Sequence, residues 1–198
     1  MEWNTNLSKC NIILGSKSPR RKDILKKMGI KFTVQKIDFE ENTDFSKSIK
    51  DVAQSISRLK SNSFNKLKKN DILICADTIV SIEEKKFGKP SSKKEAFYML
   101  KQLSGKNHQV TTGVTIKNIY KKRTFFDTTI VSFKKLNDYE INYYIEYYNP
   151  IDKAGAYAIQ EWIGLVAIKK IEGSYFNVVG LPSEKLYSEL IRFVNEKN

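Results

Sequence analysis

The stretch "DILICADTIVSI", Asp71 to Ile82, is the most apolar run of this 198-residue chain. Such a run is typical of a central strand that is buried on both faces of a sheet. Asp77 interrupts the run, and the apolar pattern resumes after it at Ile79 and Val80. Because an unpaired buried carboxylate is costly, Asp77 favours a functional role as metal ligand or base over a cap of the next turn.

Upstream of this run, a second apolar stretch leads into a helix. "NIILG", Asn11 to Gly15, predicts a short buried strand that ends in glycine. Ser18 is a good N-cap, and Pro19 suits the first helical position, where a missing N–H costs nothing. Gly29 is placed to end this helix.

Two of the chain's five arginines, Arg20 and Arg21, stand in the first turn of that helix. The unpaired N–H groups and the dipole of a helix N-terminus attract anions, and a guanidinium fork matches phosphate oxygens in a bidentate way. The alternative is an ordinary capped helix with solvated cations in its first turn. On these grounds both interpretations stay open.

The remaining elements predict an α/β protein with a mixed sheet, because strands and helices alternate early and strands run consecutively in the middle. The length fits one domain over residues 1–198. Further helices are expected at Ser48–Lys69, Ser92–Leu103, Asp138–Tyr148 and after Pro182, and further strands at Lys31–Ile37, Gln109–Lys117, Thr124–Phe133, Val166–Ile171 and Ser174–Val179.

Composition excludes several classes of function. The formal charge of +13 suggests polyanionic ligands, but the lysines are scattered over the whole chain, which favours a generally solvated basic surface. Cys10 and Cys75 are expected to be reduced, packed thiols. His108, the only histidine, excludes a two-histidine metal site and is interpreted as structural or surface-exposed. No signal peptide or bilayer-spanning run is seen, so we expect a cytoplasmic protein without a membrane partner.

Three shorter motifs carry weaker signals. "DFEEN" places Asp38, Glu40 and Glu41 after a predicted strand, as ligands for a hard cation or as solvated loop acids. "FGKP" holds Lys89 in a rigid loop that can aim an ammonium group at phosphate. Gln160 in "DKAGAYAIQ" can read a base edge through two hydrogen bonds, or it is a buried, satisfied amide.

Together and in this order, the motifs resemble the Maf family of nucleoside triphosphate pyrophosphatases. The matching stretches cover nearly the whole chain at similar spacing. They are "LGSKSPRRKDILKKMGIKF", "FEEN", "ADTIV", "GKP", "EAFYMLKQLSGKNHQVTTGV", "DKAGAYAIQ" and "IEGSYFNVVGLP".

The resemblance implies hydrolysis of nucleoside triphosphates between the α- and β-phosphates, with release of pyrophosphate and with a divalent cation such as Mg²⁺, Mn²⁺ or Co²⁺. It also implies a homodimer and a mixed α/β fold on an elongated sheet flanked by helices, related to inosine triphosphatases. Asp77 matches the family's catalytic proton acceptor, and Glu41 matches a carboxylate that shares the metal with it. Residues at phosphate-contacting positions are Ser16, Arg21, Lys89 and Lys60, the last in "ISRLKS" where the family has "LAxxKA".

Within the family, three positions follow the substrate. The branch acting on dTTP and UTP has Arg, Thr and Gln there, and the branch acting on 7-methyl-GTP has Trp, Gln and Glu. This chain has Arg20, Thr78 and Gln160, which predicts dTTP, UTP or modified pyrimidine nucleotides. Glu161 and Trp162 replace the glycine-rich sequence that usually follows the glutamine, and this change can alter the base pocket.

Two other classes of function fit the sequence less well. A non-enzymatic regulator of septum formation or a nucleic-acid binder fits the charge, but no helix-turn-helix, zinc-finger or aromatic RNA-binding signature is present, so a nucleic-acid partner is not expected. A binder also gives no reason for Asp77 inside a strand together with Glu41. A P-loop NTPase is excluded because G-x-x-x-x-G-K-[ST] is absent.

Overall fold

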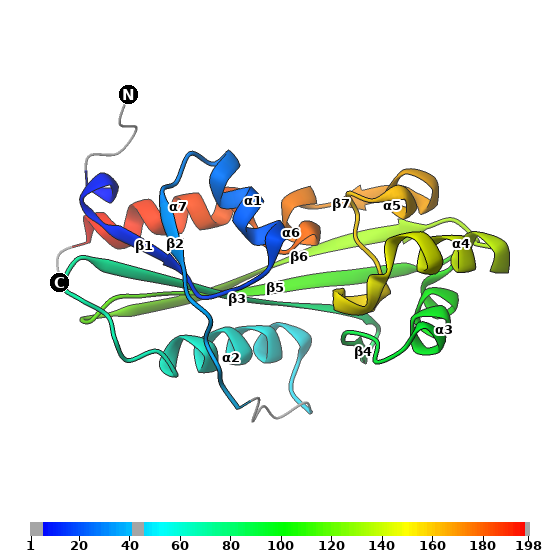
Figure 1. The fold of residues 1–198 in the computed structure, drawn as a ribbon, viewed down its shortest axis with the longest axis horizontal. Helices are drawn as coiled ribbons and strands as arrows, with labels where there is room; N and C mark the ends of the chain where they lie inside the picture. The colour runs from blue at the N-terminus through cyan, green and yellow to red at the C-terminus, as the bar shows by residue number, and fades with distance from the viewer. Residues whose placement is uncertain (1–5, 41–45, 197–198) are drawn as a thin grey trace. The chain divides into compact units, whose positions relative to one another are not determined.

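The computed structural model describes residues 6–40 and 46–196. It confirms an α/β protein with a mixed seven-stranded sheet in the order β2-β1-β3-β5-β6-β7, with β4 paired to β3 (Figure 1). Strand β1 runs parallel to β2 and β3, whereas the β3–β4 and β6–β7 pairs are antiparallel. The strands are β1 Asn11–Leu14, β2 Phe32–Val34, β3 Asp71–Ile82, β4 Lys85–Phe87, β5 Asn107–Lys117, β6 Lys122–Phe133 and β7 Ile168–Glu172.

Ser18 caps α1 as expected, and Ser48 and Ser92, which were expected to be the first helical residues, are the N-caps of α2 and α3. No helix of the described ranges is long and apolar enough to cross a bilayer. The α-helices are α1 Pro19–Lys27, α2 Ile49–Asn62, α3 Lys93–Leu103, α4 Asp138–Tyr148, α5 Trp162–Ala167, α6 Tyr175–Val179 and α7 Ser183–Asn195, and the 3-10 turns are η1 Leu7–Lys9, η2 Pro150–Asp152 and η3 Ala154–Ala156.

The chain packs as two compact units, and strands β3, β5 and β6 contribute residues to both. The first unit comprises Met1–Asp77, Thr112–Asp127 and Gly180–Asn198, and the second comprises Thr78–Thr111 and Thr128–Val179.

In the first unit, α1 and α7 lie on one side of the strands and α2 lies on the other (Figure 1). Helix α2 approaches β5 so closely at Gly113 that a Cβ atom there would lie 2.2 Å from the backbone oxygen of Ala53. Beside this contact, the buried Ser57 hydroxyl bonds to the Thr115 hydroxyl at 2.9 Å. Glycine in the strand therefore sets the distance between α2 and the sheet.

Helix α2 ends at Asn62, so the expectation that it runs to Lys69 is wrong. The Lys117 ammonium of β5 donates to the backbone oxygens of Ser61 at 2.9 Å and Phe64 at 3.3 Å. A cation that binds the carbonyls of the last turn stabilises a helix end, because these carbonyls have no intrahelical partner. The end of α2 is thus fixed by a residue distant in sequence.

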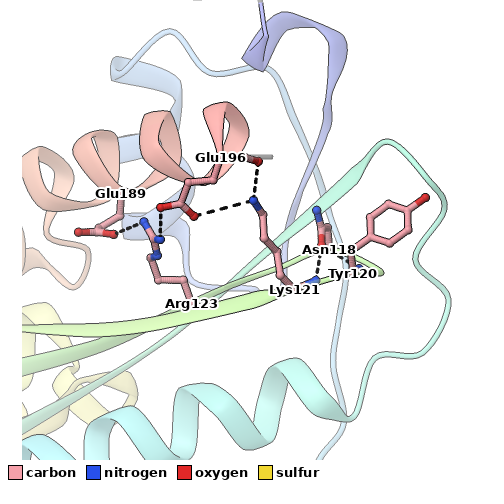
Figure 2. A network of polar contacts seen from close by, with 6 residues as sticks. All are labelled: Asn118, Tyr120, Lys121, Arg123, Glu189 and Glu196. Carbon is pink, nitrogen blue, oxygen red and sulfur yellow. Dashed lines mark hydrogen bonds and ion pairs between the residues drawn. The ribbon is translucent and has the colours of Figure 1, made fainter. Parts of the chain in front are cut away.

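The C-terminal end of α7 is tied to the β5–β6 hairpin (Figure 2). Arg123 donates to the carboxylates of Glu189 at 3.0 Å and Glu196 at 2.5 Å, and Lys121 donates to the Glu196 backbone oxygen at 2.9 Å. The Asn118 side chain accepts the backbone N–H of Lys121 at 2.7 Å and so shapes the hairpin turn. One guanidinium fork therefore spans two acidic residues of the helix end.

The second unit holds an aromatic cluster, which we define as His108, Phe133 and Tyr157. The His108 ring is 1% exposed, its Nε2 bonds to the Tyr157 hydroxyl at 2.7 Å, and its ring centre lies 4.8 Å from that of Phe133. Burial lowers the pKa of His108 to about 4, because the interior disfavours the imidazolium form. His108 is therefore a structural residue that is neutral at pH 7.

One late prediction of strand is wrong in the second unit, and another is confirmed with shifted bounds. Ser174–Val179 contains the helix α6. The buried side-chain amide of Asn177 donates to the Val110 backbone oxygen at 2.9 Å and to the Thr129 hydroxyl at 3.0 Å. The backbone N–H of Asn177 donates to the Ser174 hydroxyl at 3.2 Å. Because a buried amide needs partners, these bonds favour a helical turn over the strand that the apolar residues suggest. The expected strand Val166–Ile171 is present as β7, but it begins only at Ile168, after helix α5.

Candidate functional site

The loop before α1 holds the Arg21 side chain from two directions. Arg21 donates through Nε to the Gly180 backbone oxygen at 2.8 Å and through Nη1 to the Ser16 hydroxyl at 3.3 Å. The backbone N–H of Arg21 donates to the capping hydroxyl of Ser18 at 3.5 Å. Burial lowers the pKa of Arg21, while the Asp77 carboxylate acts in the opposite direction. The guanidinium is thus fixed at the start of a helix, near a carboxylate.

Gly15 allows this loop to lie against β3. Its backbone N–H donates to the Ile74 oxygen at 2.8 Å, and a Cβ at this position would lie 2.5 Å from Ile37 Cδ1 and 2.6 Å from Cys75 Sγ. Burial raises the pKa of the Cys75 thiol to about 12, although the cations of Lys60 and Arg21 oppose the shift. Cys75 is therefore an inert packing residue, as the sequence predicted.

Asp77 sits in β3 and is paired with Lys60 of α2. The Lys60 ammonium lies 2.5 Å from Asp77 Oδ1, and the two side chains are 18% and 23% exposed, respectively. The same ammonium lies 5.0 Å from the centre of the Phe39 ring. Pairing removes the cost that an isolated carboxylate inside an apolar strand would carry, while partial exposure leaves it accessible.

The other expected site residues occupy different surroundings. Arg20 is half-buried in α1 of the first unit, and Thr78 is half-buried in β3 of the second unit. Gln160 and Lys89 are both exposed in the second unit, so the alternative of a buried, satisfied Gln160 is wrong. Glu41 lies outside the described residues. The structure therefore brings together Ser16, Arg21, Lys60 and Asp77, and it places Thr78, Lys89 and Gln160 in the second unit.

The residues after Gln160, which depart from the family's usual text, have structural partners. Glu161 accepts a hydrogen bond from the Tyr144 hydroxyl and lies 3.5 Å from the buried Lys153 ammonium. The Trp162 ring packs at 4.8 Å from that of Tyr143. These contacts anchor the chain that follows Gln160 to α4, so the departure fixes this turn to the second unit.

Two contacts of the site were missed by sequence reasoning. Phe39 contributes its ring to Lys60, and Gly180 contributes its backbone oxygen to Arg21. Gly180 has a φ of 126°, a conformation that side-chain-bearing residues rarely adopt. The available signal was that both residues lie within or beside the stretches "DFEEN" and "VVGLP".

The described residues contain no group of three or more His, Cys, Asp or Glu that could hold a metal ion. Asp77 supplies one carboxylate, and Lys60 occupies one of its oxygens. This donor set suits a cation such as Mg²⁺, which commonly takes one or two carboxylates and completes its coordination with phosphate oxygens and water. Asp77 is therefore the one described residue of the site that fits a substrate-borne metal.

The sequence that forms this site also matches a known protein family. The family model described as "Maf-like protein" matches residues 11–193. This chain belongs to the Maf family. The match covers every residue of the charged site, which we define as Ser16, Arg21, Lys60 and Asp77.

Curated relatives are similar to this Maf chain over almost its full length. A protein of Porphyromonas gingivalis is 43% identical over 192 residues, which are 95% of this chain and 96% of the relative. A protein of Phocaeicola vulgatus is 44% identical (93% and 97%), and one of Cytophaga hutchinsonii is 45% identical (96% and 87%). All three are named dTTP/UTP pyrophosphatase.

Among solved structures, the Staphylococcus aureus Ham1 protein resembles this Maf chain with a TM-score of 0.50. The match covers 90% of this chain and 99% of the Ham1 chain at 16% sequence identity. At that identity the likeness concerns the fold alone.

Proposed function

We propose that this Maf protein hydrolyses dTTP and UTP to the nucleoside monophosphate and pyrophosphate. The observation that carries the proposal is the identity of 43–45% to relatives named dTTP/UTP pyrophosphatase, which extends over 93–96% of the chain. Arg20, Thr78 and Gln160 support it, because all three are of the type that the resemblance associates with pyrimidine nucleotides.

The charged site supports this chemistry. In our proposal, Asp77 accepts a proton from the attacking water while the bond between the α- and β-phosphates breaks and pyrophosphate leaves. A polyanion must be neutralised before a nucleophile can approach, and Arg21 and Lys60 supply fixed positive charge. Ser16 orients the Arg21 fork, and the exposed Lys89 supplies a further cation for the outer phosphates.

A divalent cation such as Mg²⁺, Mn²⁺ or Co²⁺, held by Asp77 and Glu41, would neutralise phosphate charge and make the attacking water more acidic. Arg20 and Gln160 are proposed to read the base through the fork and the amide, with Thr78 beside the proton acceptor. Each role predicts a different kinetic effect: changes at Arg20 or Gln160 alter substrate ranking, whereas changes at Arg21 weaken turnover of all substrates.

A panel of triphosphates tests the proposal. Purified protein is incubated with dTTP, UTP, 5-methyl-UTP, CTP, GTP and 7-methyl-GTP in the presence of each of the three metals, and pyrophosphate and single phosphate are measured separately. We expect pyrophosphate as the product and the highest kcat/KM for dTTP and UTP. Faster hydrolysis of 7-methyl-GTP would overturn the substrate assignment, and release of single phosphate would overturn the reaction.

The family resemblance also supports a homodimer in the cytoplasm. Light scattering of the purified protein at micromolar concentration tests the first point, with twice the chain mass of 22.9 kDa expected. A mass equal to one chain across the working range would contradict the dimer.

A further inference from the structure

The Lys60 ammonium contacts two chemically different groups in the first unit. One is the Asp77 carboxylate, at 2.5 Å, and the other is the Phe39 ring, whose centre lies 5.0 Å away. Lys60 is 18% exposed and Phe39 is half-buried. A cation within about 6 Å of a ring centre is attracted by the negative face of the ring, and the attraction grows as water is removed.

The chemistry of the ring suits a place beside a reactive carboxylate. A lysine has a long, flexible stem, so one ion pair alone holds its ammonium loosely. A second carboxylate would restrain Lys60 but would also compete with Asp77 for protons and for a cation. An aromatic ring attracts the ammonium but offers no lone pair that could bind a proton or a metal cation.

We propose that Phe39 is a positioning residue for the reaction, acting through Lys60. Its ring face holds the Lys60 ammonium beside Asp77, so that positive charge is in place where the phosphates bind. This inference rests on the proposed pyrophosphatase activity. It assigns a role to Phe39, an uncharged residue of the otherwise acidic stretch "DFEEN".

Fluorinated rings at position 39 give the sharpest test, because they keep the shape of phenylalanine while the negative face becomes weaker. With mono-, di- and trifluorophenylalanine at Phe39, we expect log kcat/KM for dTTP to fall steadily, reaching about threefold to tenfold below the parent protein. Phe39→Tyr should retain activity, and Phe39→Leu should lose about as much as the trifluoro ring. The same analogues at Phe125, a core ring that is 8% exposed, serve as the control and should show no trend.

A double-mutant cycle separates positioning from general packing. Phe39→Leu should lower kcat/KM in the parent protein but have little further effect in a Lys60→Met background, since the residue through which it acts is gone. Equal losses in both backgrounds, or a flat fluorination series, would overturn the proposal.

The same cycle measured as the urea midpoint of unfolding needs no activity, so the two proposals can fail separately. A parent protein that releases no pyrophosphate from any triphosphate overturns the proposed function and, with it, the positioning role, while coupling between Phe39 and Lys60 in unfolding still reports the contact. An active parent protein with no kinetic coupling overturns the Phe39 role alone.

Discussion

The charged site of the first unit and the aromatic cluster of the second unit show two ways of placing polar groups in a protein. Lys60 and Asp77 are partly exposed and form an ion pair with each other. His108 and Tyr157 are sealed from water, and burial lowers the pKa of the imidazole and raises that of the phenol, so both stay neutral. Since a charge needs water or a partner and a neutral group needs only a hydrogen bond, the first arrangement suits chemistry and the second suits stability.

The largest expected effect breaks the charged site without breaking the fold. Asp77→Asn should lower pyrophosphate release from dTTP by at least about a hundredfold, because an amide cannot accept the proton from water. The amide oxygen can still accept a hydrogen bond from Lys60, so the unfolding midpoint should change little. Pyrophosphate release and urea unfolding of the same sample measure both quantities.

Asp71, at the start of the same strand, is the matched control. Its carboxylate is 6% exposed and accepts hydrogen bonds from the Lys68 N–H at 2.8 Å and the Asn11 amide at 3.2 Å. Asp71→Asn should destabilise the protein by about 1–2 kcal/mol and leave kcat/KM unchanged. If turnover responded to Asp71→Asn as strongly as to Asp77→Asn, the comparison would fail.

The second prediction concerns the packing that carries Lys60. Gly113→Ala should destabilise the protein by about 3 kcal/mol, because the added methyl group would overlap the Ala53 backbone and push α2 away from β5. Gly88→Ala is the control, since a Cβ there would meet nothing within 4 Å. Urea unfolding of both variants measures the difference, and equal midpoints would contradict the role of Gly113.

The third prediction tests the aromatic cluster through pH. In the folded protein the pKa of His108 is about 4, below the unfolded value of about 6.5, so the unfolded state binds its proton first. The stability that the neutral ring contributes is complete above about pH 6.5 and is lost as the pH falls toward 4. Between pH 7 and pH 4.5, the free energy of unfolding of the parent protein should fall by about 2 kcal/mol more than that of the His108→Phe variant. Urea unfolding of both proteins across this pH range measures the difference, and parallel profiles of unfolding free energy against pH would contradict this assignment.

The smallest effect is expected at the surface network of Figure 2. Arg123→Lys removes the fork that reaches both Glu189 and Glu196, and the loss should be below about 1 kcal/mol because the pairs are partly solvated. Hydrogen bonding to Arg123 lowers the pKa of Glu196, so this contribution is present at neutral pH and is lost on acidification. The melting temperatures of the parent protein and the variant should differ at low salt and converge at high salt. A loss as large as that of Gly113→Ala would contradict this ranking.

Local signals predicted much of the fold because they act within a few residues. The strand Asp71–Ile82 and the helix Asp138–Tyr148 have the predicted bounds, since a continuous apolar run and a capped helix before Pro150 need no distant partner. The elements that were wrong depend on distant residues. Asn177 stabilises the helix Tyr175–Val179 by bonding to β5 and β6, and Lys117 of β5 binds the end of α2.

By itself, the sequence determined the family, the order of most elements and the residue types expected at the site. The tertiary structure decided which of these residues meet. Lys60 and Asp77 stand 17 residues apart and pair because Gly113 lets α2 lie directly on the sheet. Phe39 and Gly180 join the site through a ring face and a backbone oxygen, neither of which has a charge or a spacing that a sequence pattern can detect. The physical reason is that periodicity reports which face of an element is apolar, whereas a contact between two elements depends on the distance and angle at which their faces pack.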